Sequence, residues 1–331
     1  MTVVVITGAR LHFGLLCGRP DSGWHYGGVG MMVDQPAWEI QVSWASAIET
    51  DVVHAPDVTR DRVQTVLSRF RHVVADLSSV ECTVHRAASF HSGLGAGTQF
   101  TLALGTALLM LTGRPRPDDI SEFASTLDRS RRSAVGTYGF DHGGFVVDHG
   151  IPQDSTASRS FDRVRFPDSW RIVMLTPQTA EGLSGETEET FFGRQDYLNE
   201  DMVSQIGQVI EPNIVEALRG EDFSRFRDAL ESYGHLAGEY YAAAQGGVFS
   251  NRQMENVVHE LKLKGITGAV QSSWGPTVCI PAQSNRAAHK IRAAAMESDH
   301  GANIVTEIVR GLNIGATVRT TAPEHGHRSF G

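Results

Sequence analysis

Residues 91–99 read His-Ser-Gly-Leu-Gly-Ala-Gly-Thr-Gln, and they stand between a short apolar segment and a long run of small and aliphatic residues. The segment 82–86 is typical of a strand, and the run 98–111 is typical of a buried helix. Glycine at every second position lets the backbone approach a ligand closely. The first turn of a helix offers unpaired N–H groups and the positive end of the helix dipole. This stretch therefore predicts a phosphate-binding loop.

Two further glycine-rich loops stand at residues 26–30, Tyr-Gly-Gly-Val-Gly, and 271–277, Gln-Ser-Ser-Trp-Gly-Pro-Thr. One such loop alone is more often only a turn, but three in one chain favour a ligand-binding cleft. No Gly-Lys-Ser/Thr step of a nucleotide-binding P-loop is present. The first 261 residues hold no lysine, so a phosphate there must be held by arginine, backbone N–H groups or a metal.

The distribution of elements predicts an α+β fold in two domains, residues 1–155 and 156–331. We place the boundary in the polar stretch 154–160, which contains no apolar run. Before it we expect strands at 3–16 (interrupted near Gly8), 38–44, 82–86 and 145–147, and helices at 59–77, 98–111 and 118–127. After it we expect strands at 172–175, 269–271, 277–280 and 304–309, and helices at 199–210, 222–241, 251–262 and 285–296.

Composition narrows the class of protein. The chain has 331 residues and a net charge of −9, which argues against nucleic acid or an anionic membrane as its main partner. Its cysteines, Cys17, Cys82 and Cys279, lie far apart and cannot pair evenly, which indicates a reducing compartment. No apolar run is long enough to span a bilayer. We therefore expect a cytoplasmic protein.

Several motifs carry a resemblance to a known family. Residues 9–14 (Ala-Arg-Leu-His-Phe-Gly), 26–30, 95–99, 132–145 and 271–277 resemble, in order, those of β-ribofuranosylaminobenzene 5′-phosphate synthase. The segment from Gly182 to Phe192 also resembles this family. It is a branch of the GHMP kinase superfamily, which includes homoserine and mevalonate kinases, and residues 93–98 resemble the phosphate loop of that superfamily. The run 271–277 is the most specific of these motifs.

The resemblance implies a GHMP-kinase-like fold, with an N-terminal domain like ribosomal protein S5 domain 2, a ferredoxin-like C-terminal domain and the site between them. It also implies a reaction that joins phosphoribosyl pyrophosphate to 4-aminobenzoate, with loss of carbon dioxide and pyrophosphate, in the biosynthesis of methanopterin-type cofactors. The sequence leaves 4-hydroxybenzoate open as the acceptor.

At one position the sequence departs from the kinases of the superfamily, and this difference bears on which reaction the protein catalyses. Several superfamily kinases carry the catalytic carboxylate in a Ser-Gly-x-Asp step, whereas residues 133–136 here read Ser-Ala-Val-Gly. A glycine at that position favours a synthase over a kinase, because a phosphoryl-transfer enzyme would lack its usual base. An ATP-dependent small-molecule kinase remains the alternative enzyme, and a catalytically inactive ligand-binding regulator is a third reading.

The candidate catalytic residues are Arg10, His12, Arg132 and Glu189. The candidate substrate- and phosphate-binding residues are Gly27, Gly28, Gly93, Gly95, Ala96, Gly97, Thr98, Gln99, Ser272, Ser273 and Trp274. Mg²⁺ is the expected cofactor; it would bridge substrate phosphates to Glu186 and Glu189 and would be held loosely, because this ion keeps several waters. Structural roles remain alternatives for Arg10, His12 and Trp274. We expect small-molecule partners and leave a homodimer open.

Overall fold

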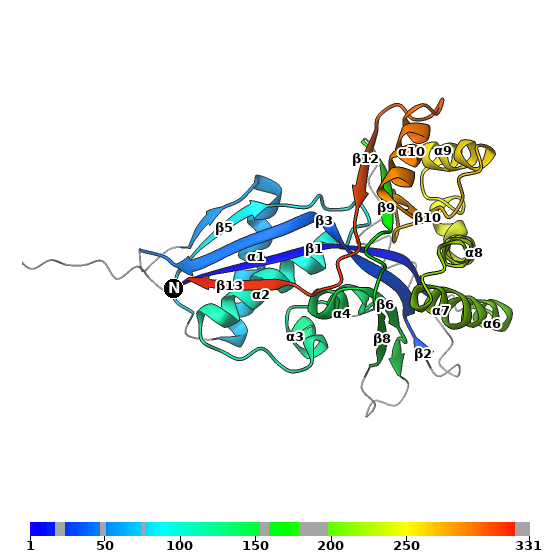
Figure 1. The fold of residues 1–331 in the computed structure, drawn as a ribbon. Coiled ribbons are helices and arrows are strands. Elements are labelled where there is room, and N and C mark those ends of the chain that lie inside the picture. The colour runs from blue at the N-terminus through cyan, green and yellow to red at the C-terminus, as the bar shows by residue number, and fades with distance from the viewer. Residues whose placement is uncertain are drawn as a thin grey trace, which may run out of the picture.

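The computed structural model describes residues 1–16, 24–46, 51–74, 77–130, 132–152, 159–178 and 198–321. Its largest element is a mostly antiparallel sheet with the strand order β13-β1-β3-β5-β4, to which β6 adds beside β3 and β8 beside β6. The strands β1 (Thr2–Leu16) and β3 (Gly27–Trp44) run side by side along the sheet (Figure 1). The edge strand β4 (Val52–His54) is parallel to β5 (Val80–Arg86).

The interruption expected near Gly8 is a bulge inside one continuous strand. The pairing of β1 with β3 shifts register between Thr7 and Ala9, and again between His12 and Gly14. A Cβ atom at Gly8 would lie 2.0 Å from the carbonyl oxygen of Val33, so only glycine fits there. The second shift lies beside His12, where the strand reaches the candidate site.

Helices α1 (Asp57–Val73), α2 (Ala96–Leu111), α3 (Ile120–Thr126) and α4 (Val135–His142) pack against one face of this sheet (Figure 1). The helix α2 is buried at almost every position, since its residues are small or aliphatic. It packs on β1 and β3, with Phe100 against Trp38 at 5.1 Å between ring centroids. This packing fixes the loop before α2 at the surface of the sheet.

A second, antiparallel sheet has the order β10-β11-β9-β12 and lies towards the carboxyl end of β1 (Figure 1). Its strands are β10 (Val270–Gln271), β11 (Val278–Ala282), β9 (Arg171–Pro177) and β12 (Ile304–Val309). One face packs against α9 (Arg252–Leu263) and α10 (Asn285–Met296).

A separate apolar cluster joins the two sheets. It contains Leu11 and Phe13 of β1, Ile172 of β9, and Phe226 and Tyr233 of α8 (Phe223–Gln245). The elements α6 (Glu200–Val209), a π-helical turn (Ile210–Val215) and α7 (Glu216–Arg219) lead into α8. The mixed α+β class is confirmed. None of the described helices is both long enough and apolar enough to cross a membrane.

The strand pairing differs from the expected division at residues 155 and 156. The strand β8 (Phe161–Val164) pairs with β6 (Phe145–Asp148), and β13 (Thr317–Thr321) pairs with β1, so both belong to the first sheet. In the sequence the polar stretch 154–160 falls between β6 and β8, and residues 153–158, which include the expected boundary, lie outside the described residues. The short strands β2 (Trp24–His25) and β7 (Ile151–Pro152) pair with each other. All five residues of β13 are exposed, and its sequence has no alternation of apolar and polar residues that would have predicted a strand.

Candidate active site

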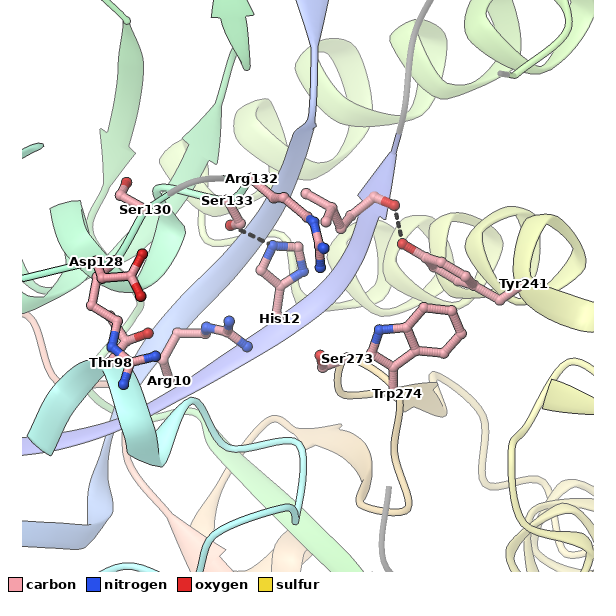
Figure 2. Close-up of a pocket in the computed structure, with 12 residues that line it drawn as sticks. Arg10, His12, Thr98, Asp128, Ser130, Arg132, Ser133, Tyr241, Ser273 and Trp274 are labelled. Atoms are coloured by element: carbon pink, nitrogen blue, oxygen red, sulfur yellow. Dashed lines mark hydrogen bonds between the residues drawn. The ribbon is translucent and has the colours of Figure 1, made fainter. Parts of the chain in front are cut away.

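Two adjoining cavities lie where β1, the loop 91–97 and the loop 271–277 meet (Figure 2). The inner cavity measures about 310 Å³ and the outer cavity about 330 Å³. Both are lined by Arg10, Thr98, Arg129, Ser273 and Trp274. These residues come from distant parts of the chain, so the cleft exists only in the folded protein.

Hydrogen bonds lock the two loops to β1. The Ser272 hydroxyl donates to the Gly93 carbonyl at 2.7 Å and accepts from the His12 N–H at 3.1 Å. The Ser273 N–H donates to the His12 carbonyl at 2.6 Å. Gly93 has a φ of +80°, and a Cβ there would lie 2.3 Å from the Ser272 carbonyl oxygen, so the contact requires glycine. The two loops therefore form one wall of the cleft.

The loop before α2 has the features of an anion site. The helix begins at Ala96 after Gly95, which has a φ of +65°, and no side chain caps its first turn. Ala96 and Gly97 line the outer cavity. A Cβ at Gly97 would meet nothing closer than an Arg129 nitrogen at 4.0 Å, so the space in front of this turn is open. The uncapped N–H groups are available to a ligand.

Arginine dominates the charge of the lining. Four described residues that line the cavities are arginines, Arg10, Arg62, Arg129 and Arg132, whereas Asp128 is the one carboxylate among them. The Arg62 guanidinium lies 4.0 Å from the centre of the Phe90 ring. Burial lowers the pKa of Arg129, which nevertheless stays cationic at neutral pH. The cleft is therefore suited to an anion with several charges.

An aromatic wall borders the inner cavity on the side of α8. Trp274 packs against Tyr241 with ring centroids 4.5 Å apart, and the Tyr241 hydroxyl donates to the Leu15 carbonyl (Figure 2). Only 7% of the Trp274 surface is exposed. The two ring planes are inclined at 59°, and the wall presents aromatic surface to the same cavity that the arginines line.

His12 lines the inner cavity, although only 2% of its surface is exposed. Its Nδ1 accepts the Gly14 N–H at 3.3 Å, so Nε2 carries the proton and donates to Ser133 Oγ at 2.7 Å. Burial, followed by the charges of Arg10 and Arg159, holds the pKa of His12 well below 6.5. At neutral pH the ring is therefore uncharged, and the catalytic role of His12 stays a prediction.

A buried ion pair holds the segment that carries Arg132 and Ser133. Arg159 donates to Asp148 at 2.6 Å and to the Arg132 carbonyl at 2.6 Å. Asp148 in turn accepts the Ala134 N–H at 2.7 Å. The Asp148 side chain is fully buried and that of Arg159 is 9% exposed. The pair positions this segment beside the cavity.

The structure gathers most of the predicted site residues at the two cavities. Lining them are Arg10, Arg132, Gly93, Gly95, Ala96, Gly97, Thr98, Ser273 and Trp274. Glu186 and Glu189, the predicted metal ligands, lie outside the described residues. No group of three or more metal-ligating side chains occurs in the described part of the chain.

Other predicted residues have different roles. Gln99 is fully buried; it accepts from the Thr7 hydroxyl at 2.8 Å and donates to the Gly136 carbonyl at 2.7 Å. Ser272 is buried in the loop contacts described above. Both side chains therefore join elements instead of facing a ligand. Gly27 and Gly28 line a separate, mostly apolar cavity of about 300 Å³ with β6 and α6. None of these four residues lines the two cavities, and their binding roles stay predictions.

Sequence reasoning missed several lining residues. Arg62 lies on the exposed side of a predicted helix, and Arg129 and Asp128 follow another, where charged residues are ordinary. Tyr241 lies far from any glycine-rich motif. Only the tertiary contacts bring these four to the cleft.

Known proteins share this sequence pattern and fold. No family model matches the chain. A protein of Archaeoglobus fulgidus named beta-ribofuranosylphenol 5'-phosphate synthase is 29% identical over 293 residues, covering 84% of this chain and 87% of the relative. A protein of the same name from Methanothermobacter thermautotrophicus is 25% identical over 293 residues, covering 83% and 87%.

Solved structures support the same fold. The homoserine kinase of Cytophaga hutchinsonii superposes with a TM-score of 0.64 at 17% identity, over 96% of this chain and 97% of that one. The mevalonate diphosphate decarboxylase of Staphylococcus aureus gives 0.61 at 11% identity, over 96% and 98%. The resemblance predicted from the motifs, the GHMP-kinase-like fold and the prediction of an enzyme are confirmed.

The neutral state of His12 predicts a pH dependence of stability. The unfolded chain takes up a proton at this residue below about pH 6.5, whereas the folded protein resists it, so stability is lost as the pH falls below that value. We expect the unfolding free energy of the wild type to fall further between pH 7.5 and 5.5 than that of His12→Gln, by up to about 1.4 kcal/mol, the limit that the unfolded pKa sets. Denaturant titrations at the two pH values measure this. Equal slopes, or a steeper fall in the variant, would contradict it.

Proposed function

We propose that this chain is a β-ribofuranosylaminobenzene 5′-phosphate synthase, which joins phosphoribosyl pyrophosphate to 4-aminobenzoate with loss of carbon dioxide and pyrophosphate. The observation that carries the proposal is one cleft with arginines and an uncapped helix N-terminus on one side and the Trp274–Tyr241 wall on the other. A polyanionic sugar and an aromatic acid together match these two surfaces. The relatives' name specifies a phenol product, so 4-hydroxybenzoate is the alternative acceptor.

The proposed reaction requires different interactions from the arginine-lined side and the aromatic side of the cleft. When the bond from the anomeric carbon to the diphosphate breaks, positive charge develops on the ribose and negative charge on the leaving group. Arginines and backbone N–H groups stabilise the leaving diphosphate. A ring carbon of the aromatic acid, held by the wall, bonds to the anomeric carbon. Loss of the carboxyl group as carbon dioxide then returns its bonding electrons to the ring and restores aromaticity.

The position of Gly136 weighs against the kinase alternative. A Cβ there would lie 3.4 Å from Arg10 Nε and 3.5 Å from Thr98 Cγ2, both residues of the cavity lining. A side chain at this position would therefore reach the cleft, and glycine leaves no carboxylate there. Isothermal titration tests the choice: the proposal expects tight binding of phosphoribosyl pyrophosphate and weak binding of ATP. Tight ATP binding with phosphoryl transfer would overturn it.

The phosphate loop is tested at Gly97. Gly97→Ala adds a methyl group in open space in front of the first turn of α2, without backbone strain. We expect about a 10-fold weaker affinity for phosphoribosyl pyrophosphate, as for the loss of one hydrogen bond to a charged group. Gly207→Ala, also helical and with nothing within 4 Å of its added Cβ, is the matched control. Gly95→Val is less informative, because its Cβ would lie 3.0 Å from Arg10.

Equal affinity in the folded Gly97→Ala variant and the wild type would exclude this loop as the phosphate site. A parallel loss in Gly207→Ala would show that the effect is not local.

The aromatic wall is tested at Trp274. Stacking of the substrate ring is worth about 0.5–1.5 kcal/mol. We expect Trp274→Ala to raise the KM for the aromatic acid about 2- to 12-fold, with a smaller change in the KM for phosphoribosyl pyrophosphate. Trp274→Phe keeps a ring and should recover most of the difference. If both KM values and the melting temperature worsen together, Trp274 only packs the loop.

Mg²⁺ is proposed as a cofactor that bridges the substrate's phosphates. Asp128 is one carboxylate in the described lining, and its partner Arg69 lies 3.0 Å away, which suits a loosely held ion better than a permanent one. Bound Mg²⁺ would neutralise charge on the diphosphate. Elemental analysis should find the purified enzyme metal-free, and EDTA should abolish turnover until Mg²⁺ is restored. A stoichiometric metal that resists EDTA would contradict this.

A further inference from the structure

The hydroxyl group of Ser133 has a direction imposed on it by its neighbours. Its Oγ accepts one hydrogen bond from His12 Nε2 at 2.7 Å and a second from the Val135 N–H at 3.2 Å. A serine hydroxyl has two acceptor positions and one hydrogen to donate. Because both acceptor positions are filled, the hydrogen is left to donate elsewhere. Ser133 lines the inner cavity, and Figure 2 shows its side chain there, joined to His12.

We infer that Ser133 is a fixed hydrogen-bond donor to an anionic oxygen of the bound substrates, and that His12 is the positioning residue that sets the direction of this donor. The inference rests on the proposed function and assigns roles within the same cleft. It gives His12, a candidate catalytic residue, an indirect role in which the ring gives up no proton.

The direction of the bond between His12 and Ser133 follows from the surroundings of the ring. The Gly14 N–H occupies Nδ1, so the single ring proton resides on Nε2 and points at Ser133. The charged groups that act on the ring, Arg10 and Arg159, are both cations and oppose a second proton. His12 is also held at both ends of its backbone, through Ser272 and Ser273. With its single proton on Nε2, the ring presents a donor and not an acceptor to Ser133.

The backbone of Ser133 is held as firmly as its side chain. The next residue, Ala134, donates its N–H to the buried Asp148, and the preceding Arg132 carbonyl accepts from Arg159. A donor fixed in this way needs no reorganisation when a ligand arrives, which is the property that stabilises negative charge most effectively.

The chemistry of the acceptor follows from the rest of the inner cavity. Arg10, Arg129 and Arg132 line it together with Ser133, so its occupant is an anion. Two substrate groups have this chemistry, a phosphate of phosphoribosyl pyrophosphate and the carboxylate of the aromatic acid. A hydroxyl donates equally well to either, and separate measurements for the two substrates distinguish them.

The test is a double-mutant cycle on the full-length enzyme with Ser133→Ala, His12→Leu and the pair combined. We expect Ser133→Ala to lower kcat/KM about 10- to 100-fold, as for a lost hydrogen bond to a charged group. His12→Leu should lower it about 5- to 20-fold, and should have no further effect when Ser133 is already alanine. Binding of phosphoribosyl pyrophosphate alone, by isothermal titration, and the KM for the aromatic acid show which anion the hydroxyl contacts.

Ser133→Ala removes the acceptor of the Val135 N–H and could therefore fail to fold. In that case two further substitutions of His12 still test the inference. His12→Gln places an amide N–H at about the position of Nε2 and should cost only about threefold, whereas His12→Asn is too short to reach Ser133 and should behave like His12→Leu. The control is Ser232→Ala, an exposed serine on α8 whose hydroxyl donates to the Asp228 carbonyl.

The outcomes separate the two proposals. Unchanged binding and kcat/KM in a folded Ser133→Ala variant would overturn the role of Ser133, and additive effects of the two substitutions would overturn the positioning role of His12. Equal losses in His12→Gln and His12→Asn would also exclude that role. Failure of the wild-type enzyme to consume phosphoribosyl pyrophosphate with either aromatic acid would instead overturn the proposed function, and this inference with it.

Discussion

The structure depends most on the contacts that Ser272 makes between three separate parts of the chain. Its hydroxyl donates to the Gly93 carbonyl and accepts from the His12 backbone, so the loop of the second sheet, the phosphate loop and β1 are fixed at one point. A glycine at position 93 is needed because the Ser272 carbonyl lies where a side chain would begin. The Ser272 side chain thus bridges backbone groups of the two loops and β1 and fixes one wall of the cleft.

Electrostatics explains why this cleft can hold a polyanion in a chain of net charge −9. Arginines from β1, α1 and the segment 129–132 converge on the two cavities, while the Arg159 charge is balanced by the buried Asp148. Burial first, and then the charges of Arg10 and Arg159, keep His12 neutral, so its ring orients Ser133 instead of exchanging protons. Of these two cations, Arg10 also lines the cavities that the proposed anion would occupy.

The sequence predicted the elements with a clear period and the loops with a clear motif, because both depend on local chemistry. The helix α2, with the loop that precedes it, and the strands β9 and β11 lie close to where their patterns indicated, while phosphate binding by that loop stays a prediction. The exposed strand β13 and the glycine-rich α4 carry no such pattern. Gln99 and Ser272 looked like ligand contacts, since a motif does not reveal that a side chain is already bonded within the protein. Arg62 and Arg129 reach the cleft only through tertiary packing.

The proposed function requires that this one cleft bind a phosphoribosyl diphosphate and an aromatic acid and join them with decarboxylation. The most direct measurement incubates the enzyme with carboxyl-labelled 4-aminobenzoate, phosphoribosyl pyrophosphate and Mg²⁺, and follows labelled carbon dioxide and pyrophosphate together, with 4-hydroxybenzoate in a parallel reaction. The account predicts equal amounts of the two products and none when phosphoribosyl pyrophosphate is omitted. Release of pyrophosphate without labelled carbon dioxide, or no release of either with both acids, would contradict it.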